Sequence, residues 1–195
     1  MKNSLLRLLL LVITSFNIIS CDNNDTEALK NVQENPLKEY LNNSGFDQVT
    51  YQFINSGYYE FGFRFIPKTD GTIKKIIVKT PDNQTNLRVT IWDVVTKIIY
   101  RTEIISSVLA ATETSKTISP LSLLQDKEYM ITYAADDWYY HRRSDSSDAM
   151  YPILAGNILI TGYNFMNIQP QTQLYPTSTE LNGYAGDISF VFQPN

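Results

Sequence analysis

One stretch of the chain decides the fold, Asn86-Leu-Arg-Val-Thr-Ile-Trp-Asp-Val-Val-Thr-Lys-Ile-Ile-Tyr-Arg-Thr-Glu-Ile104. Its first half alternates apolar with mostly polar side chains, and β-branched residues resume after the turn at Ile98 and Ile99. The stretch therefore predicts two β-strands joined by a short turn. A hairpin of this kind exposes an apolar face and two unpaired edges, so it needs neighbouring strands and an opposing sheet.

The flanking sequence supplies further segments in which apolar and polar residues alternate. We predict strands at 48–53, 61–66, 73–79, 116–118, 129–133, 157–163 and 187–192. Ile73 and Ile76 are three residues apart, which breaks the alternation and predicts a bulge at the intervening lysines. The small and polar segment 106–115 is expected to be a connection, and 164–183 a long polar loop.

This pattern predicts about eight or more strands and no core helix. The expected fold is therefore all-β, an antiparallel two-sheet β-sandwich of the jelly-roll or immunoglobulin-like kind. We expect three parts: a signal peptide over 1–20, a lipidated tether over 21–45 and the β-sandwich domain over 46–195. The tether is expected to contain a short helix from Leu37 to Leu41, ended by the Asn43-Ser44-Gly45 segment.

The bulk composition excludes several classes of function. The net charge is −4 and there is no basic run, so we expect no nucleic-acid partner. The chain has one Cys and one His, which makes an internal disulfide impossible and a zinc site of Cys and His ligands very improbable. We expect no metal and no cofactor.

The N-terminus has the layout of an export signal. Lys2 and Arg7 precede an apolar run that is too short for a comfortable membrane span. The run ends in Ile18-Ile19-Ser20-Cys21, which resembles the lipobox of bacterial lipoproteins. The resemblance implies cleavage after Ser20, with lipidation of Cys21 by acyl chains such as palmitate. Several acyl chains hold a protein to a bilayer where a single chain does not.

This resemblance implies a place in the bacterial cell envelope, anchored by lipid to a membrane, with the outer membrane as the leading choice. The alternative is an ordinary signal peptide whose Cys falls there by chance. The segment after Cys21 is acidic and resembles the surface-export signals of some bacterial lipoproteins, but it also reads as a solvated tether. The periplasmic and the cell-surface side therefore both stay open.

Four motifs follow one another along the chain: Phe63-Arg-Phe65, Gly71-Thr-Ile73-x-x-Ile76, Val89-x-Ile91-Trp92-Asp93 and Leu123-x-x-x-x-x-Tyr129-x-Ile131-x-Tyr133. In these motifs residues 58–193 resemble a bacterial β-sandwich domain of unknown function that often accompanies extracellular carbohydrate-active and adhesive modules. The motifs consist mostly of core and turn residues. The resemblance therefore implies the fold and carries over no catalytic residue.

The best candidate for a binding site is the segment Asp136-Asp-Trp-Tyr-Tyr-His-Arg-Arg143. Aromatic faces stack on the apolar side of a sugar ring, while Asp and Arg hydrogen-bond its hydroxyls. The candidate residues are Asp136, Asp137, Trp138, Tyr139, Tyr140 and Arg142. The alternative is a strand whose alternate aromatics enter the core.

Trp92 is a second candidate contact, with the alternative that it packs at a strand end while Asp93 caps the turn. Acids at Asp136, Asp137, Asp145 and Asp148 match no calcium-loop spacing. No nucleophile elbow, metalloprotease helix or phosphate loop is present in the sequence, although a carboxylate pair of the glycosidase type stays open.

We therefore expect a non-catalytic binding module in the envelope, with glycans as the leading ligand class. The alternative is a structural or assembly subunit that binds a protein partner through a sheet edge or a Tyr-rich face. A glycan module predicts a cleft that exposes Trp138 or Tyr140, whereas an assembly subunit predicts a flat apolar patch or an uncovered edge strand.

Overall fold

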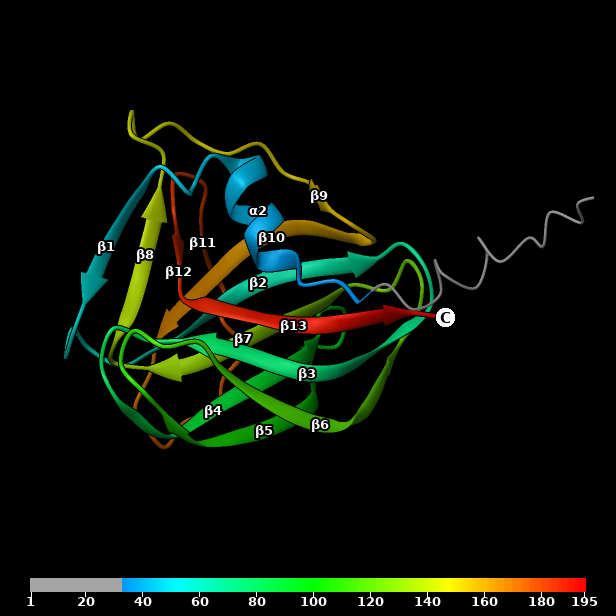
Figure 1. Cartoon of the computed structure of the whole chain (residues 1–195), viewed down its shortest axis with the longest axis horizontal. Coiled ribbons are helices and arrows are strands. Elements are labelled where there is room, and N and C mark those ends of the chain that lie inside the picture. The colour runs from blue at the N-terminus through cyan, green and yellow to red at the C-terminus, as the bar shows by residue number, and fades with distance from the viewer. Residues whose placement is uncertain (1–32) are drawn as a thin grey trace, which may run out of the picture.

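A computed structural model describes residues 33–195 of the chain (Figure 1). The proposed signal peptide, Cys21 and most of the proposed tether lie outside the described residues. The elements are α2 (Pro36–Ser44), β1 (Val49–Phe53), β2 (Tyr59–Pro67), β3 (Gly71–Lys79), β4 (Gln84–Asp93), β5 (Ile99–Val108), β6 (Thr114–Leu123), β7 (Tyr129–Ala135), β8 (Trp138–Arg142), β9 (Ile153–Ala155), β10 (Ile158–Asn167), β11 (Ser178–Glu180), β12 (Tyr184–Ala185) and β13 (Asp187–Pro194).

The strands form two packed layers, which confirms the predicted all-β sandwich. One layer is a sheet in the order β11-β10-β2-β7-β4-β5, with β9 paired to β10. The other layer consists of two three-stranded sheets, β13-β3-β6 and β1-β8-β12. All strand pairs within residues 33–195 are antiparallel. In Figure 1, β1, β8 and β12 stand together at the left, while β13, β3 and β6 run side by side across the rest of the molecule.

The two sheets of the second layer meet where β12 runs directly into β13 through Gly186. Gly186 has a φ of 93°, in the left-handed region that favours glycine. A Cβ atom at this position would lie 2.6 Å from the ring of Phe61 in the opposite layer. The junction therefore requires glycine for both its backbone conformation and its close packing.

Aromatic rings fill the space between the layers. Phe61, Phe63 and Phe65 alternate along β2 and are all buried. Phe190 of β13 packs on Phe65 with ring centroids 4.8 Å apart, so the rings join the two layers directly. Full burial of one such side chain contributes about 1.5–3 kcal/mol to the free energy of unfolding.

The hairpin predicted over residues 86–104 is confirmed as β4 and β5. Asp93 caps the intervening turn, because its Oδ1 accepts a hydrogen bond from the Thr96 amide at 2.9 Å. The predicted bulge is also present, as a shift in the β3–β6 register between Ile73 and Lys75.

Two segments differ from the prediction because polar composition concealed strands. The segment 106–115 was expected to be a connection, but β5 continues to Val108 and β6 begins at Thr114. Here serine and threonine occupy exposed strand positions while Val108 is fully buried. The strand predicted at 116–118 is also too short, since β6 runs through Pro120 to Leu123. An edge strand tolerates this proline, because it has one unpaired side.

The predicted loop over 164–183 is likewise shorter than expected. β10 extends to Asn167, and β11 follows at Ser178–Glu180. The connection that remains is 168–177, which we call the strap because it lies over the outer face of the seven-stranded sheet.

The helix α2 is part of the packed body. Pro36 occupies its first turn, where a missing N–H costs nothing, and Gly45 ends it with a φ of 75°. Tyr40 is fully buried against Phe63 and Tyr184. The segment 36–44 therefore contributes a side chain to the core of the sandwich.

Candidate functional site

The sandwich has an aromatic pocket where its layers separate beside β1 and β11. We call it the β1/β11 pocket, and its volume is about 240 Å³. Seven of its nine lining residues are aromatic, and they come from β1, β2, β8 and β10. The remaining two are Glu180 of β11 and Ala185 of β12. A concave, mostly apolar site with one charged group is typical of small-ligand binding.

Trp138 is the central side chain of the pocket wall. The β1–β8 register places Phe53 directly opposite it, and the two rings stack at 5.4 Å with an interplanar angle of 14°. Tyr59 meets Trp138 edge-on at 5.3 Å, and Phe61 lies 5.5 Å from it on the core side. Trp138 is 9% exposed, whereas Phe53 is 39% exposed. Phe53 therefore forms the mouth of the pocket and Trp138 its inner wall.

Glu180 and Tyr140 form the polar part of the pocket. The Tyr140 hydroxyl donates a hydrogen bond to Glu180 Oε1. Burial and this hydrogen bond raise the pKa of Tyr140, so the phenol stays protonated and keeps donating. Gly183 makes the contact possible, because a Cβ there would lie 2.0 Å from the Tyr140 hydroxyl oxygen and clash with it.

The other candidate residues of the 136–143 segment lie away from this pocket. Asp137 is 4% exposed and accepts hydrogen bonds from the Asn55 amide at 2.6 Å and from Gln84. Burial raises the pKa of Asp137. Asp136 Oδ1 accepts a bond from Gln84 Nε2 at 3.3 Å. Both acids therefore fasten the β7–β8 connection to neighbouring segments.

Tyr139 and Arg142 also make contacts outside the pocket. Lys79 Nζ lies 5.1 Å above the ring of Tyr139. Arg142 stacks over Tyr51 at 5.0 Å and donates a hydrogen bond to its hydroxyl at 2.9 Å. The imidazole of the single histidine, His141, forms hydrogen bonds with the Asp187 carboxylate and the Thr50 hydroxyl. Of the predicted segment, the structure thus brings only Trp138 and Tyr140 into one pocket.

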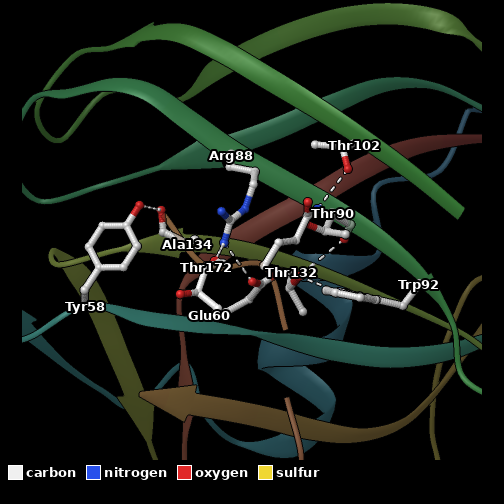
Figure 2. Close-up of polar contacts among 10 residues, drawn as sticks. Tyr58, Glu60, Arg88, Thr90, Trp92, Thr102, Thr132, Ala134 and Thr172 are labelled. Carbon is white, nitrogen blue, oxygen red and sulfur yellow. Dashed lines mark hydrogen bonds and ion pairs between the residues drawn. The ribbon is translucent and has the colours of Figure 1, made fainter. Parts of the chain in front are cut away.

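Trp92 lies on the outer face of the seven-stranded sheet, in a different region from Trp138. Figure 2 shows its indole pointing toward Thr132, with Glu60 and Arg88 close by. Trp92 Nε1 donates to Thr132 Oγ1 at 2.9 Å, and Thr132 Oγ1 donates to Glu60 Oε1 at 2.8 Å. Tyr175 of the strap packs edge-on against Trp92 at 5.7 Å. Trp92 is 2% exposed and therefore has no free face for a ligand.

Glu60 and Arg88 form a buried ion pair beneath the strap. The Arg88 Nη2 to Glu60 Oε2 distance is 3.0 Å, and the Glu60 side chain is fully buried. Burial raises the pKa of Glu60, against the opposing effects of Thr132 and Arg88. Arg88 Nη2 also donates a hydrogen bond to the Thr172 carbonyl (Figure 2). Gln173 Nε2 donates hydrogen bonds to the hydroxyls of Thr90 and Thr102. The ion pair therefore helps to fix the strap on the sheet.

The strap links this polar network to the pocket. Asn164 Nδ2 donates to the Pro176 carbonyl at 3.1 Å, two residues before β11 begins. β11 then pairs with β10 through three residues that end at Glu180. The position of the Glu180 carboxylate thus depends on how firmly the strap is held.

Sequence reasoning named two of the nine lining residues as site candidates, Trp138 and Tyr140, and missed the other seven: Phe53, Tyr59, Phe61, Tyr163, Phe165, Glu180 and Ala185. Phe53 is the last residue of a predicted strand, and an aromatic residue at the end of a strand is only a weak sign of a binding site. Glu180 lies in a stretch read as loop, and only its pairing with β10 brings it to the aromatic rings.

Within residues 33–195, no group of three or more His, Cys, Asp or Glu side chains is arranged to hold a metal ion. The same residues contain no helix long and apolar enough to cross a membrane. Comparison of the chain with models of known families and with curated protein sequences finds no match.

Proposed function

We propose that the protein is a lipid-anchored binding module of the bacterial cell envelope that holds a glycan residue in the β1/β11 pocket without catalysis. The observation that carries this proposal is the pocket itself, in which Trp138, Phe53 and Tyr140 surround a space beside the Glu180 carboxylate. Aromatic faces suit the apolar side of a sugar ring, and a carboxylate accepts hydrogen bonds from its hydroxyls.

The composition of the pocket favours binding over glycoside hydrolysis. Hydrolysis of this kind uses two carboxyl groups about 5–9.5 Å apart across the bond that breaks. Glu180 is the single acid among the lining residues that the structure describes. It also keeps one oxygen occupied by the Tyr140 hydroxyl, which supports a role in holding a ligand.

A glycan-array screen with the full chain tests this function. Phe53→Ala removes an exposed ring at the mouth of the pocket and should abolish binding with little loss of stability. Tyr100→Ala is the matched control, because Tyr100 is 40% exposed on β5, outside the pocket lining. Silence of the native protein across a broad array, or equal binding by the Phe53→Ala protein, would contradict the proposal.

A second candidate function is assembly with a protein partner through β1. This strand forms the end of its sheet and pairs with β8 alone. Its sequence, Val49 to Phe53, contains no charge and no proline, the residues that usually keep an edge strand from pairing. Tyr51, Phe53 and the following Ile54 are exposed. An added strand at this edge would gain main-chain hydrogen bonds.

Cross-linking in native membranes tests the second function. Gln52→Pro removes a backbone donor from β1 and should eliminate cross-links to a partner if the edge pairs with it. Cross-links that persist unchanged with Gln52→Pro would exclude this edge as the contact.

A further inference from the structure

The charge of the β1/β11 pocket distinguishes among ligands of similar size. Glu180 is the only carboxylate among its lining residues, and the described lining includes no Lys, Arg or His. The faces of the surrounding aromatic rings carry the negative part of the ring quadrupole. Both contributions favour a positive charge inside the pocket and oppose a negative one.

The orientation of the rings adds to this preference. Phe53 stands at 88° to Tyr140, and Tyr59 at 70° to Trp138. The ring planes therefore face different directions, so that a compact group in the pocket meets more than one aromatic surface. This is the arrangement by which aromatic cages hold quaternary and other organic ammonium groups.

Arg142 is the cation nearest in sequence to the pocket wall, two residues after Tyr140. Its guanidinium is engaged with Tyr51 through both stacking and a hydrogen bond. It thus lies outside the lining, and its charge opposes a bound cation only from a distance. Removal of this charge should strengthen the binding of a cation, whereas removal of Glu180 should weaken it.

We propose that the β1/β11 pocket selects ligands that carry an organic ammonium group. The aromatic rings supply cation–π attraction, and the Glu180 oxygen not bonded by Tyr140 supplies the counter-charge. The ammonium comes either from an amino sugar or from a quaternary headgroup. This inference rests on the proposed function, since it assigns a ligand class to the same pocket.

Two matched ligand pairs test the preference by tryptophan fluorescence, with the full chain in a polyoxyethylene detergent. Choline is compared with 3,3-dimethylbutan-1-ol, its uncharged isostere, and glucosamine with glucose. At least one charged member should bind about tenfold more tightly than its neutral counterpart. Glu180→Gln should reduce that affinity about fivefold or more, because it removes the counter-charge and keeps the shape. Glu103→Gln, on the opposite edge of the sandwich, should leave the affinity unchanged.

The outcomes separate this inference from the function on which it rests. Tight binding of glucosamine alone assigns the ammonium to an amino sugar, and tight binding of choline assigns it to a quaternary group. Equal binding of glucose and glucosamine, together with equal binding of choline and its isostere, overturns the charge preference but leaves a glycan site. No binding of any probe, together with a silent glycan array, overturns both. Arg142→Gln provides an independent check, since weaker binding of a cation by this variant would contradict the electrostatic argument.

Discussion

The two lateral edges of the sandwich differ in their strands and in how they are closed. At the β5/β6 edge, Lys116 Nζ bonds Glu103 at 2.7 Å and the Ile104 carbonyl at 2.9 Å. Tyr100 donates to the Ser122 carbonyl at 3.1 Å, which ties the same two strands together. At the β1/β11 edge, the layers separate and aromatic rings line the space between them. Long polar side chains close one edge, while rings leave the other open to a ligand.

The comparison teaches that the open edge needs support from elsewhere. β1 and β11 are short strands, each with a single neighbour in its sheet. The strap, which leads into β11, is held by Arg88 at the Thr172 carbonyl, by Thr90 at Gln173 and by Asn164 at the Pro176 carbonyl. Trp138 holds β8 against β2. We therefore expect substitutions at Arg88 and Trp138 to lower the free energy of unfolding more than substitutions in the charged network of the β5/β6 edge.

The largest effect is expected for Arg88→Ala. This change leaves the fully buried Glu60 carboxylate without its partner and releases the Thr172 carbonyl of the strap. Loss of one partner of a buried ion pair costs about 3–5 kcal/mol in the free energy of unfolding. Urea denaturation measures it, with the surface variant Lys68→Ala as control. A cost below about 1 kcal/mol would show that the ion pair does not support the strap.

The next largest effect is expected for Trp138→Ala. The substitution removes the ring that packs on Phe61, Tyr59 and Phe53, and it leaves a cavity next to the existing pocket. We expect a loss of about 3 kcal/mol, at the lower end for a large aromatic, because the pocket side is already open. Thermal unfolding of the Ala and Phe variants checks this, and Trp138→Phe should lose clearly less. Equal losses in both variants would contradict the packing role.

Tyr140→Phe should have a moderate and pH-dependent effect. At neutral pH it removes the hydrogen bond to Glu180, at a cost of about 1–2 kcal/mol. The pKa of Tyr140 is raised above its usual value near 10, so the folded state keeps the proton longer than the unfolded state does. Its contribution is therefore complete below about pH 10 and is lost as the pH rises further.

Stability measured between neutral pH and pH 11 tests this sign. The native protein should lose stability more steeply above about pH 10 than the Tyr140→Phe protein. Other buried tyrosines, including Tyr133 and Tyr163, also have raised pKa values and produce an alkaline loss of stability in both proteins. Identical slopes in the two proteins would refute a raised pKa at Tyr140.

The smallest effect is expected at the closed edge. Glu103 bridges Lys116 and Arg101, whose side chains are 35% and 32% exposed. Glu103→Ala should therefore cost about 1 kcal/mol or less, and the difference should shrink in high salt. Urea denaturation at two salt concentrations measures it. A loss as large as that of Arg88→Ala would remove the contrast between the two edges.

The sequence predicted the sandwich because its strands carry strong alternation. Phe61, Phe63 and Phe65 on β2, and the hairpin around Trp92, define the buried faces through local pattern alone. β5 and β6 were predicted too short, since their exposed serines and threonines resemble those of loops. The alternation of apolar and polar residues therefore shows clearly which face of a strand is buried. It shows less clearly where a strand with polar residues begins or ends.

The pocket was predicted only in part, because its residues come from segments that are distant in sequence. Trp138 and Tyr140 stand out as an aromatic cluster in one segment, and alternation places them on a common strand face. Phe53 joins Trp138 through the pairing of β1 with β8, across 85 residues of chain. Glu180 joins Tyr140 through a hydrogen bond between residues 40 apart. The local pattern of the sequence contains neither relation. Trp92 shows the opposite error, because the sequence suggested a ligand contact where the structure has a buried side chain. The strap that covers Trp92 is distant in sequence, so the local pattern does not reveal this burial.

The chain offers a direct test, because it contains two tryptophans, one in the pocket and one beneath the strap. The measurement is a ¹H–¹⁵N correlation spectrum of the two indole N–H groups during titration with glucosamine and choline. If the β1/β11 pocket is the binding site, the Trp138 signal shifts in a saturable manner while the Trp92 signal stays in place. Two stationary signals, or a shift of Trp92 alone, would contradict the account.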